Sequence, residues 1–448
     1  MKYLASILLM LAMGMAVSQE YSGDEFKEDY LEACELISSK YIYFERKCAL
    51  SRSGFLEQRK LHADTIIWNR QSFVKEIRNL RATFSDGHFY WDVPREISPV
   101  DTFYTLGFVS TFTDDSLLIV KKIFPHYAPP VKIGDIISDI NNIPAKDYIK
   151  ELGRKEPQST RNATYEIAAR NLSLIRRQAP TMDSLEDVKI EVLRDQKKLV
   201  FNIGYKKCSI TTDISKSRKN KETLLLQRNG YLSLEDLPDE SISPHSSLLL
   251  YMLETEKEKY CILHPRDFVA WEAADIETIM GMIKEIGPDA LVIDLKDCSG
   301  GGFNDMLYLS YALGVEKEFK FFYDIIDKEN RRESGVDDFD FITDRISMKN
   351  SWSGKVYIRS NEICGSACDF FIRWMKMNGR AVIVGMPPAG RGGGTDDFKL
   401  KNTGTRIGFP LRERIPLDYP SSIEGETMGI DYYSEQTLDL LLDELSNH

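Results

Sequence analysis

The sequence has 448 residues, of which 42% are hydrophobic and 28% are charged, an ordinary composition for a globular protein of two or three domains. The formal net charge is −11 and no basic stripe is present, which argues against nucleic acid as the main partner. Because the chain has neither a Cys-x-x-Cys nor a His-x-x-x-His pattern, we predict no metal site and no cofactor.

The first eighteen residues have the pattern of a secretion signal. Lys2 precedes an apolar run from Leu4 to Met15, which is too short to span a bilayer comfortably. Ala16-Val17-Ser18 supplies the small residues that a signal peptidase reads. We therefore expect a signal peptide over residues 1–18 and a protein that is exported, either periplasmic or secreted, without a membrane span. The oligomeric state is left open.

Residues 19–98 are predicted to form a helical domain. Apolar residues from Phe26 to Tyr41 and from Phe73 to Phe84 follow helical spacing. The region ends at Asp86-Gly87-His88, where Asp-Gly indicates a turn that leads into a strand. Seven cysteines occur in the chain, and Cys34 could pair with Cys48 in this domain.

Residues 99–205 resemble a PDZ domain that carries an insertion. The resemblance rests on Leu106-Gly107-Phe108 and on the run from Lys132 to Asn141, which contains a Gly-Asp turn followed by spaced isoleucines. The insertion begins after Tyr148 and includes a predicted helix from Ala163 to Arg177. The resemblance implies that Leu106, Gly107 and Phe108 bind an extended peptide. The alternative is a degenerate domain that only packs.

Residues 206–448 are predicted to alternate strands and helices. Residues 206–221 are polar and are expected to form a linker or an exposed hairpin. A buried strand from Ala290 to Leu295 leads into a glycine-rich turn, Asp297 to Gly302. A second strand, Lys355 to Ile358, precedes Ser366, which stands at the start of a helix from Ala367 to Met377. On local sequence alone, a serine at this place is most often a helix cap.

Two motifs in this region resemble those of the S41 peptidases, the family of C-terminal processing and tricorn-like proteases. The nucleophile motif appears as Ser366-Ala367-Cys368-Asp369, followed by Gly379-Arg380-Ala381 and an apolar strand. The second motif, Asp-Leu-Arg-x-Asn-x-Gly-Gly, appears as Asp294 to Gly301, with Cys298 in place of the asparagine. The resemblance implies an α/β fold: an S41-like mixed-sheet catalytic domain with an N-terminal helical domain and an inserted PDZ-like domain.

The same resemblance implies a catalytic set. Ser366 is the expected nucleophile, and His88 matches the Asp-Gly-His motif of the branch that uses histidine as the general base. The lysine branch is not supported, because Arg391 stands where its lysine would be and arginine stays protonated. The third member is expected to be Glu426, with Glu424 as the second choice. The oxyanion donors are expected to be the Ala367 N–H together with Gly300 or Gly301.

The sequence therefore predicts a serine endopeptidase that hydrolyses extended or unfolded polypeptides through an acyl-enzyme. Two alternatives stay open at this point. The protein could be an inactive S41-like protein that binds peptides or ligands, or a cysteine hydrolase that uses Cys364 or Cys368. A disulfide between Cys298 and Cys364 is a further possibility, because the loops that carry them should converge.

Overall fold

The computed structural model describes residues 21–94, 96–98, 102–113, 116–124, 127–177, 187–208, 248–255, 257–269, 271–315, 321–325, 349–416, 422–434 and 438–445. The predicted signal peptide lies outside these residues, as does most of the predicted linker at 206–221. The described helices include none with the length and apolar character needed to cross a membrane.

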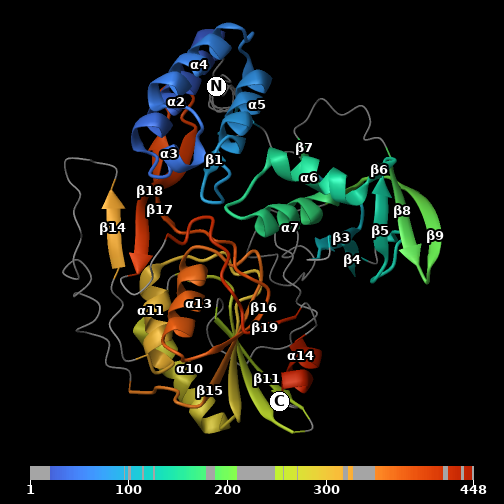
Figure 1. The fold of residues 1–448 in the computed structure, drawn as a ribbon, viewed down its shortest axis with the longest axis vertical. Helices are drawn as coiled ribbons and strands as arrows, with labels where there is room; N and C mark the ends of the chain where they lie inside the picture. The colour runs from blue at the N-terminus through green and yellow to red at the C-terminus, as the bar shows by residue number, and fades with distance from the viewer. Residues whose placement is uncertain are drawn as a thin grey trace, which may run out of the picture.

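The N-terminal region is helical, as predicted. Its helices are α2 (Gly23–Lys40), α3 (Phe44–Lys47), α4 (Arg52–Asp64) and α5 (Arg70–Ala82). Helix α2 begins at a capping box in which Ser22 and Glu25 bond each other's backbone N–H groups, a local reason for its start. These helices form the upper part of the molecule in Figure 1.

The helical region shares its core with a strand from the C-terminal part of the chain, which belongs to a sheet of four strands. These strands are β1 (Tyr90–Asp92), β14 (Phe321–Ile325), β17 (Gly393–Lys399) and β18 (Arg406–Pro416), which form one antiparallel sheet. Ile407 and Phe409 of β18 are buried in the same cluster as Phe84 and Phe89. Because β1 pairs with β18, the segment around His88 is fixed against residues more than 300 positions further along the chain.

The second region contains two antiparallel sheets and two helices. One sheet has the order β3-β4-β5-β8-β9, with β6 pairing β5, and the other has the order β10-β2-β7. The elements are β2 (Thr102–Thr105), β3 (Phe108–Phe112), β4 (Leu118–Ile123), β5 (Ile136–Ile140), β6 (Ile143–Pro144), α6 (Ala145–Lys155), α7 (Arg161–Leu172), β7 (Leu174–Arg177), β8 (Val188–Arg194), β9 (Lys197–Ile203) and β10 (Lys206–Cys208).

The predicted helix from Ala163 to Arg177 is wrong after Leu172. Helix α7 ends at Leu172, and β7 follows and pairs with β2. Pairing with β2 gives these four residues a hydrogen-bonding partner that helical periodicity does not reveal. Strand β10 also pairs with β2, so this unit continues past the predicted boundary at residue 205. The PDZ character of the unit stays a prediction.

The third region is a six-stranded mixed sheet of order β11-β12-β13-β15-β16-β19, in which only β11 is antiparallel to its neighbour. The elements are β11 (Leu248–Glu254), β12 (Lys259–Pro265), α10 (Ala273–Ile286), β13 (Ala290–Asp294), α11 (Phe303–Ala312), β15 (Lys355–Ser360), α13 (Ala367–Met377), β16 (Val382–Gly385), β19 (Tyr432–Tyr433) and α14 (Leu438–Leu445).

Helices cover both faces of this sheet (Figure 1). Leu291 and Ile293 of β13 face the cluster that contains α10, α11 and α13. Ala290 and Val292 face the other cluster, which contains α14. This burial on both sides explains why the strand is a continuous apolar run, and each buried isoleucine or leucine stabilises the fold by about 1.5–3 kcal/mol. The predicted α/β architecture of this region is confirmed.

Candidate functional site

Two loops meet at the carboxyl end of the mixed sheet. The glycine loop (residues 295–302) follows β13, and the serine loop (residues 361–366) follows β15, its parallel neighbour. A Cβ atom added to Gly300 would lie 2.7 Å from the Ser366 Cβ and 3.0 Å from the Ala367 backbone nitrogen. The structure therefore brings together Gly300, Ala367 and Ser366. Gly301 instead lies against the backbone of Phe268, which places Gly300 closer to the serine.

Ser366 has a backbone conformation that is rare for a residue with a side chain. Its φ is +56° and its ψ is −129°, at the residue that immediately precedes α13. Its hydroxyl makes no capping hydrogen bond to the helix, so the interpretation as a helix cap is wrong. Such a conformation costs about 1–3 kcal/mol and is found mainly at functional sites. The first N–H groups of α13 and the helix dipole make this position favourable for a developing negative charge.

His88 lies in the turn between α5 and β1. The backbone N–H of His88 donates to Asp86 Oδ1 at 2.7 Å, and Phe89 N–H donates to the Asp86 carbonyl. Asp86 is buried, and its Oδ2 accepts a hydrogen bond from the Tyr41 hydroxyl at 2.7 Å. Asp86 thus fixes the turn that presents the half-buried imidazole.

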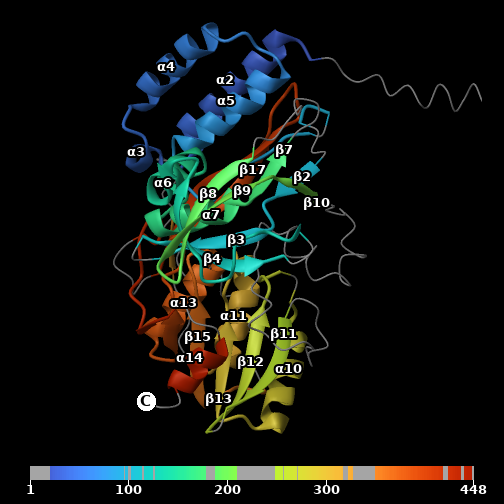
Figure 2. The same cartoon turned by 90° about the vertical axis from the view of Figure 1, so that its right-hand side faces the viewer.

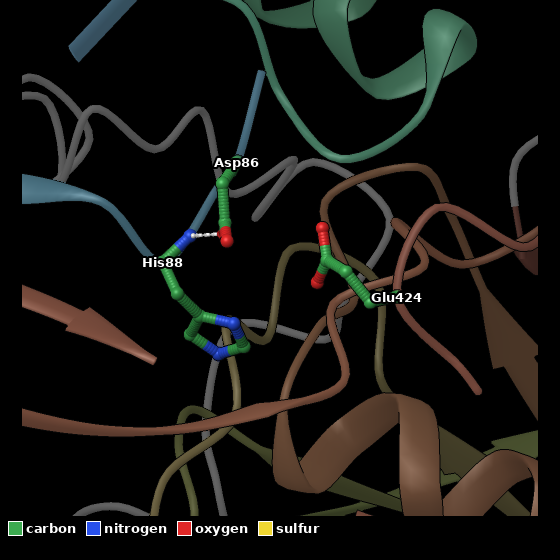
Figure 3. Close-up of side chains that lie close together, drawn as sticks. All are labelled: Asp86, His88 and Glu424. Carbon is green, nitrogen blue, oxygen red and sulfur yellow. Dashed lines mark hydrogen bonds between the residues drawn. The ribbon is translucent and has the colours of Figure 1, made fainter. Parts of the chain in front are cut away.

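The structure places Glu424 next to His88. One ligand-type atom from each of Asp86, His88 and Glu424 lies within 4.8 Å of the others. Figure 3 shows the three side chains facing a common space, Asp86 and His88 from one segment and Glu424 from another. Glu426, the first choice from the sequence, instead forms an ion pair with Arg373 of α13 at 3.4 Å. The geometry therefore favours Glu424 over Glu426 as the partner of the imidazole.

The Glu424 carboxylate is buried but is held by polar contacts. Lys47 forms an ion pair with its Oε1, and the Gly392 N–H donates to its Oε2 at 3.1 Å. Burial and the negative charge of Asp86 raise the pKa of Glu424 to about 7, and Lys47 opposes them. The carboxyl group therefore changes its charge close to neutral pH. No sequence pattern indicates Lys47 or Tyr41 as parts of this site.

One histidine and two carboxylates are also the donor types of a divalent metal site. The carboxylate oxygens here already have partners, because Lys47 and Gly392 contact Glu424 while Tyr41 and the His88 N–H contact Asp86. The Lys47 ammonium group beside the carboxylate opposes a second cation. The arrangement suits the orientation of an imidazole and the transfer of a proton better than it suits a bound metal ion.

Arg391 connects the histidine segment with the serine loop. Its carbonyl accepts the Ser366 N–H at 3.1 Å, and its side chain lies within van der Waals range of both Gly87 and Gly365. The guanidinium is buried, and burial lowers its pKa, but an arginine there is still no base. Asp369, the acid of the Ser-Ala-x-Asp motif, accepts the Gly390 and Arg391 N–H groups and so holds this segment against α13.

The predicted peptide-binding loop at residues 106–108 uses its polar groups internally. The Leu106 N–H donates to the Ser173 carbonyl at 2.9 Å, and the Gly107 N–H donates to Thr105 Oγ1 at 3.0 Å. Leu106 and Phe108 are buried in the core of this unit. The neighbouring edge of β3 is covered by α7, through hydrogen bonds such as Ser110 Oγ to the Ala169 carbonyl. The geometry gives no support to peptide binding by Leu106, Gly107 and Phe108.

Both suggested disulfides are absent among the described cysteines. Cys34, Cys48, Cys298 and Cys364 are free thiols in the structure. Cys298 and Cys364 do converge, as expected, and the thiol of Cys368 contacts both. Burial raises the pKa values of Cys364 and Cys368, so both remain protonated and weakly nucleophilic. This disfavours the cysteine hydrolase.

The comparison with protein families identifies this region. The model of peptidase family S41 matches residues 259–432, which include the glycine loop, the serine loop and Glu424. The protein carries a domain of peptidase family S41. Family S41 consists of peptidases of the serine type, and the match supports this type of activity for the region. No curated protein matches the chain.

Two solved structures of mature CPAF share the fold over nearly the whole chain, beyond the S41 domain. The structure of mature CPAF complexed with lactacystin is 14% identical, with a TM-score of 0.67, and the match covers 95% of this chain and 98% of that chain. A second structure of mature CPAF is 13% identical, with a TM-score of 0.69, covering 95% and 96%. At 13–14% sequence identity, the similarity to these two structures shows a shared fold and nothing about function.

Proposed function

We propose that the protein is an exported serine endopeptidase that cleaves extended or unfolded polypeptides through an acyl-enzyme. Ser366 attacks the scissile carbonyl, and His88 takes the proton and returns it to the leaving amine. Glu424 orients the imidazole and stabilises its charged form. The backbone N–H groups of Gly300 and Ala367 receive the negative charge of the tetrahedral intermediate.

The observation that carries this proposal is the position of Ser366 at the N-terminus of α13, packed against Gly300. Its backbone has a positive φ, and its hydroxyl makes no capping hydrogen bond to the helix. Arg391 supports the pairing with His88, because it borders Gly365 on one side and Gly87 on the other. Export rests on the residues 1–18, and the preference for extended peptides rests on the family. The inactive binding protein is the second candidate, and it is weaker because binding alone requires no strained serine.

Labelling with a fluorophosphonate tests the nucleophile directly. Such a reagent reacts with a serine that has been activated by a neighbouring base. We expect one adduct for each chain, located by mass spectrometry on the peptide that contains Ser366, together with hydrolysis of carboxymethylated casein. An intact protein that is not labelled and does not cleave casein would instead favour the binding protein.

Replacement of Gly300 by alanine should reduce turnover by about 10²–10³-fold, the usual cost of losing one oxyanion donor. The new methyl group would overlap the Gly365 carbonyl and press on Ser366, and the residue has a φ of +107°. The measurement is kcat and KM with a fluorogenic peptide. The control is Gly379→Ala, which also places a side chain at positive φ but has no atom within 4 Å of its Cβ. Equal activity of the two variants would remove Gly300 from the proposed oxyanion site.

The pH dependence of kcat/KM should report the ionisation of Glu424. Its pKa of about 7 means that the carboxyl is neutral below this pH and cannot stabilise the imidazolium. We expect kcat/KM to fall as the pH decreases through 7, approaching about tenfold per pH unit. Because Lys47 lowers the pKa of Glu424, the Lys47→Met variant should move this acidic limb of the pH profile to higher pH.

Arg46→Met, which loses its ion pair with Glu413, is the matched control and should leave the acidic limb in place. A limb that stays in place in Lys47→Met would argue against Glu424.

A further inference from the structure

The α6–α7 hairpin of the second region reaches the S41 domain beside the histidine. The Gln158 Oε1 accepts a hydrogen bond from the Arg391 guanidinium at 2.8 Å. The neighbouring Ser159 Oγ accepts the Gly87 N–H at 3.1 Å. Figure 2 shows α7 lying between the helical region and the S41 domain. The hairpin is therefore in contact with the segment that presents His88.

A second contact joins α7 to the glycine loop through buried charged side chains. Arg170 of α7 is only 4% exposed. Its Nε lies 2.6 Å from Glu166 Oε1 in the same helix, and its Nη1 lies 2.8 Å from Asp297 Oδ1 in the glycine loop. Removing these three charges from water is costly unless all of them are well paired. A buried charge pair across two regions thus fixes their relative position at this point.

Asp297 connects Arg170 to both loops of the candidate site. Its Oδ1 accepts a hydrogen bond from Asn361 Nδ2 at 2.7 Å, and its N–H donates to Asn361 Oδ1 at 3.1 Å. Asn361 Oδ1 also accepts the Ile363 N–H within the serine loop. Asp297 has a φ of +68° and stands three residues before Gly300. The hydrogen bonds between Asp297 and Asn361 therefore fix the position of the glycine loop relative to the serine loop.

The charge on Asp297 depends on Arg170. Burial alone would raise the pKa of this carboxyl, but the field of Arg170, followed by Lys296 and the Asn361 hydrogen bond, holds the pKa below its usual value. The ionised carboxylate is acceptor-only and can receive the guanidinium and the Asn361 amide together. Without Arg170, the carboxylate would lose the strongest favourable interaction that keeps it ionised in a buried place.

We propose that Arg170 is a positioning residue for the proposed hydrolysis. It acts through Asp297 and Asn361 and keeps Gly300 in the place where its N–H meets the oxyanion. The inference rests on the proposed function, because it assigns to the second region a part in that same site. The α6–α7 hairpin then serves catalysis directly, in addition to any binding of substrate by this region.

A double-mutant cycle on the full-length protein tests this role. Arg170→Met should lower kcat at least tenfold and change KM less than twofold, because the oxyanion site acts in the transition state and not in substrate binding. Asp297→Asn should lower kcat similarly, since the amide keeps the shape but loses the charge. The double variant should be no worse than the more impaired single variant, because both act through one contact. Arg154→Met, which removes an exposed arginine of α6, should behave as the wild type.

Hydrogen exchange of the same proteins gives a readout that does not depend on activity. We expect faster exchange at residues 295–302 in Arg170→Met than in the wild type, and no change in Arg154→Met. Glu166→Gln separates the positioning role from simple docking of α7. It removes the charge that pairs with Arg170 within the helix and weakens the hydrogen bonds that Glu166 Oε2 accepts from Thr111 and Phe112 of β3, but it leaves the Arg170–Asp297 contact in place. It should affect kcat less than Arg170→Met does. Equal losses in Glu166→Gln and Arg170→Met, or additive losses in the cycle, would overturn the inference.

The proposed function and this inference can fail separately. A wild-type protein that neither cleaves peptides nor labels at Ser366 contradicts the proposed function, while exchange at residues 295–302 still tests the Arg170 contact. An active wild type whose Arg170→Met variant is folded and retains its kcat contradicts the inference alone. Recovery of kcat in Arg170→Ala by guanidinium ion at millimolar concentration, with no recovery in Asp297→Asn, would support it, and absence of recovery in both would oppose it.

Discussion

Ser366→Ala should lower kcat for peptide hydrolysis by on the order of 10³–10⁶-fold, the range seen when the nucleophile of a catalytic triad is removed. The alanine keeps a Cβ at the same positive φ, so the backbone strain and the packing against Gly300 are retained. The variant should therefore keep the thermal unfolding midpoint of the wild type. The measurements are single-turnover hydrolysis of a fluorogenic peptide and thermal unfolding followed by circular dichroism.

Cys368→Ala is the informative companion of this variant. Cys368 lies two residues after the serine, is fully buried, and has a thiol whose pKa is raised by burial. We expect it to keep most of the activity, with a stability loss from the missing sulfur contacts. If Cys368→Ala were inactive while Ser366→Ala hydrolysed peptide normally, the serine mechanism would be wrong. The Cys368 thiol would then be the candidate nucleophile.

Glu424→Gln should lower kcat/KM by as much as about 10⁴-fold, the effect of exchanging the triad acid for its amide in a serine protease. The amide preserves the shape of the side chain but cannot stabilise an imidazolium, and it no longer neutralises Lys47. Glu426→Gln makes the same chemical change two residues away. It should alter kcat/KM by less than about threefold, because Glu426 pairs with Arg373 and not with the histidine.

The comparison of these two amides separates the candidates without any assumption about the substrate. Both variants should be checked for an unchanged circular dichroism spectrum, because Glu424 is buried and Glu426 is partly exposed. A severe loss in Glu426→Gln with an active Glu424→Gln would return Glu426 to the triad. Equal small losses would mean that His88 works without a carboxylate from this segment.

The sequence predicted those parts of the protein whose residues carry local signals. Helix α13 has the predicted bounds, from Ala367 to Met377, because a glycine precedes it and apolar residues recur along one face. The strand at 290–294 can be predicted because it is buried on both sides and is therefore a continuous apolar run. The convergence of the glycine loop and the serine loop followed from the motif and is explained by the parallel pairing of β13 with β15.

Other parts of the site depend on contacts that local sequence does not encode. Glu424 and Glu426 are the same residue type in one short loop. Their different positions are set by partners from distant segments, Lys47 and Gly392 for Glu424 and Arg373 for Glu426. Helical spacing predicts too long a helix here, because Leu174 to Arg177 pair with β2, about seventy residues earlier in the chain. Arg170 also looks like an ordinary helical arginine until Asp297 is placed beside it.

The left-handed backbone at Ser366 has a consequence for the natural variation that this position can tolerate. Glycine adopts such angles without a steric penalty, so a Ser366→Gly protein should be more stable than the wild type while having no nucleophile. Random drift after loss of activity would therefore move towards glycine here, since that single change relieves strain. Serine is the less stable choice at this position, and in the proposed mechanism it supplies the hydroxyl that glycine lacks.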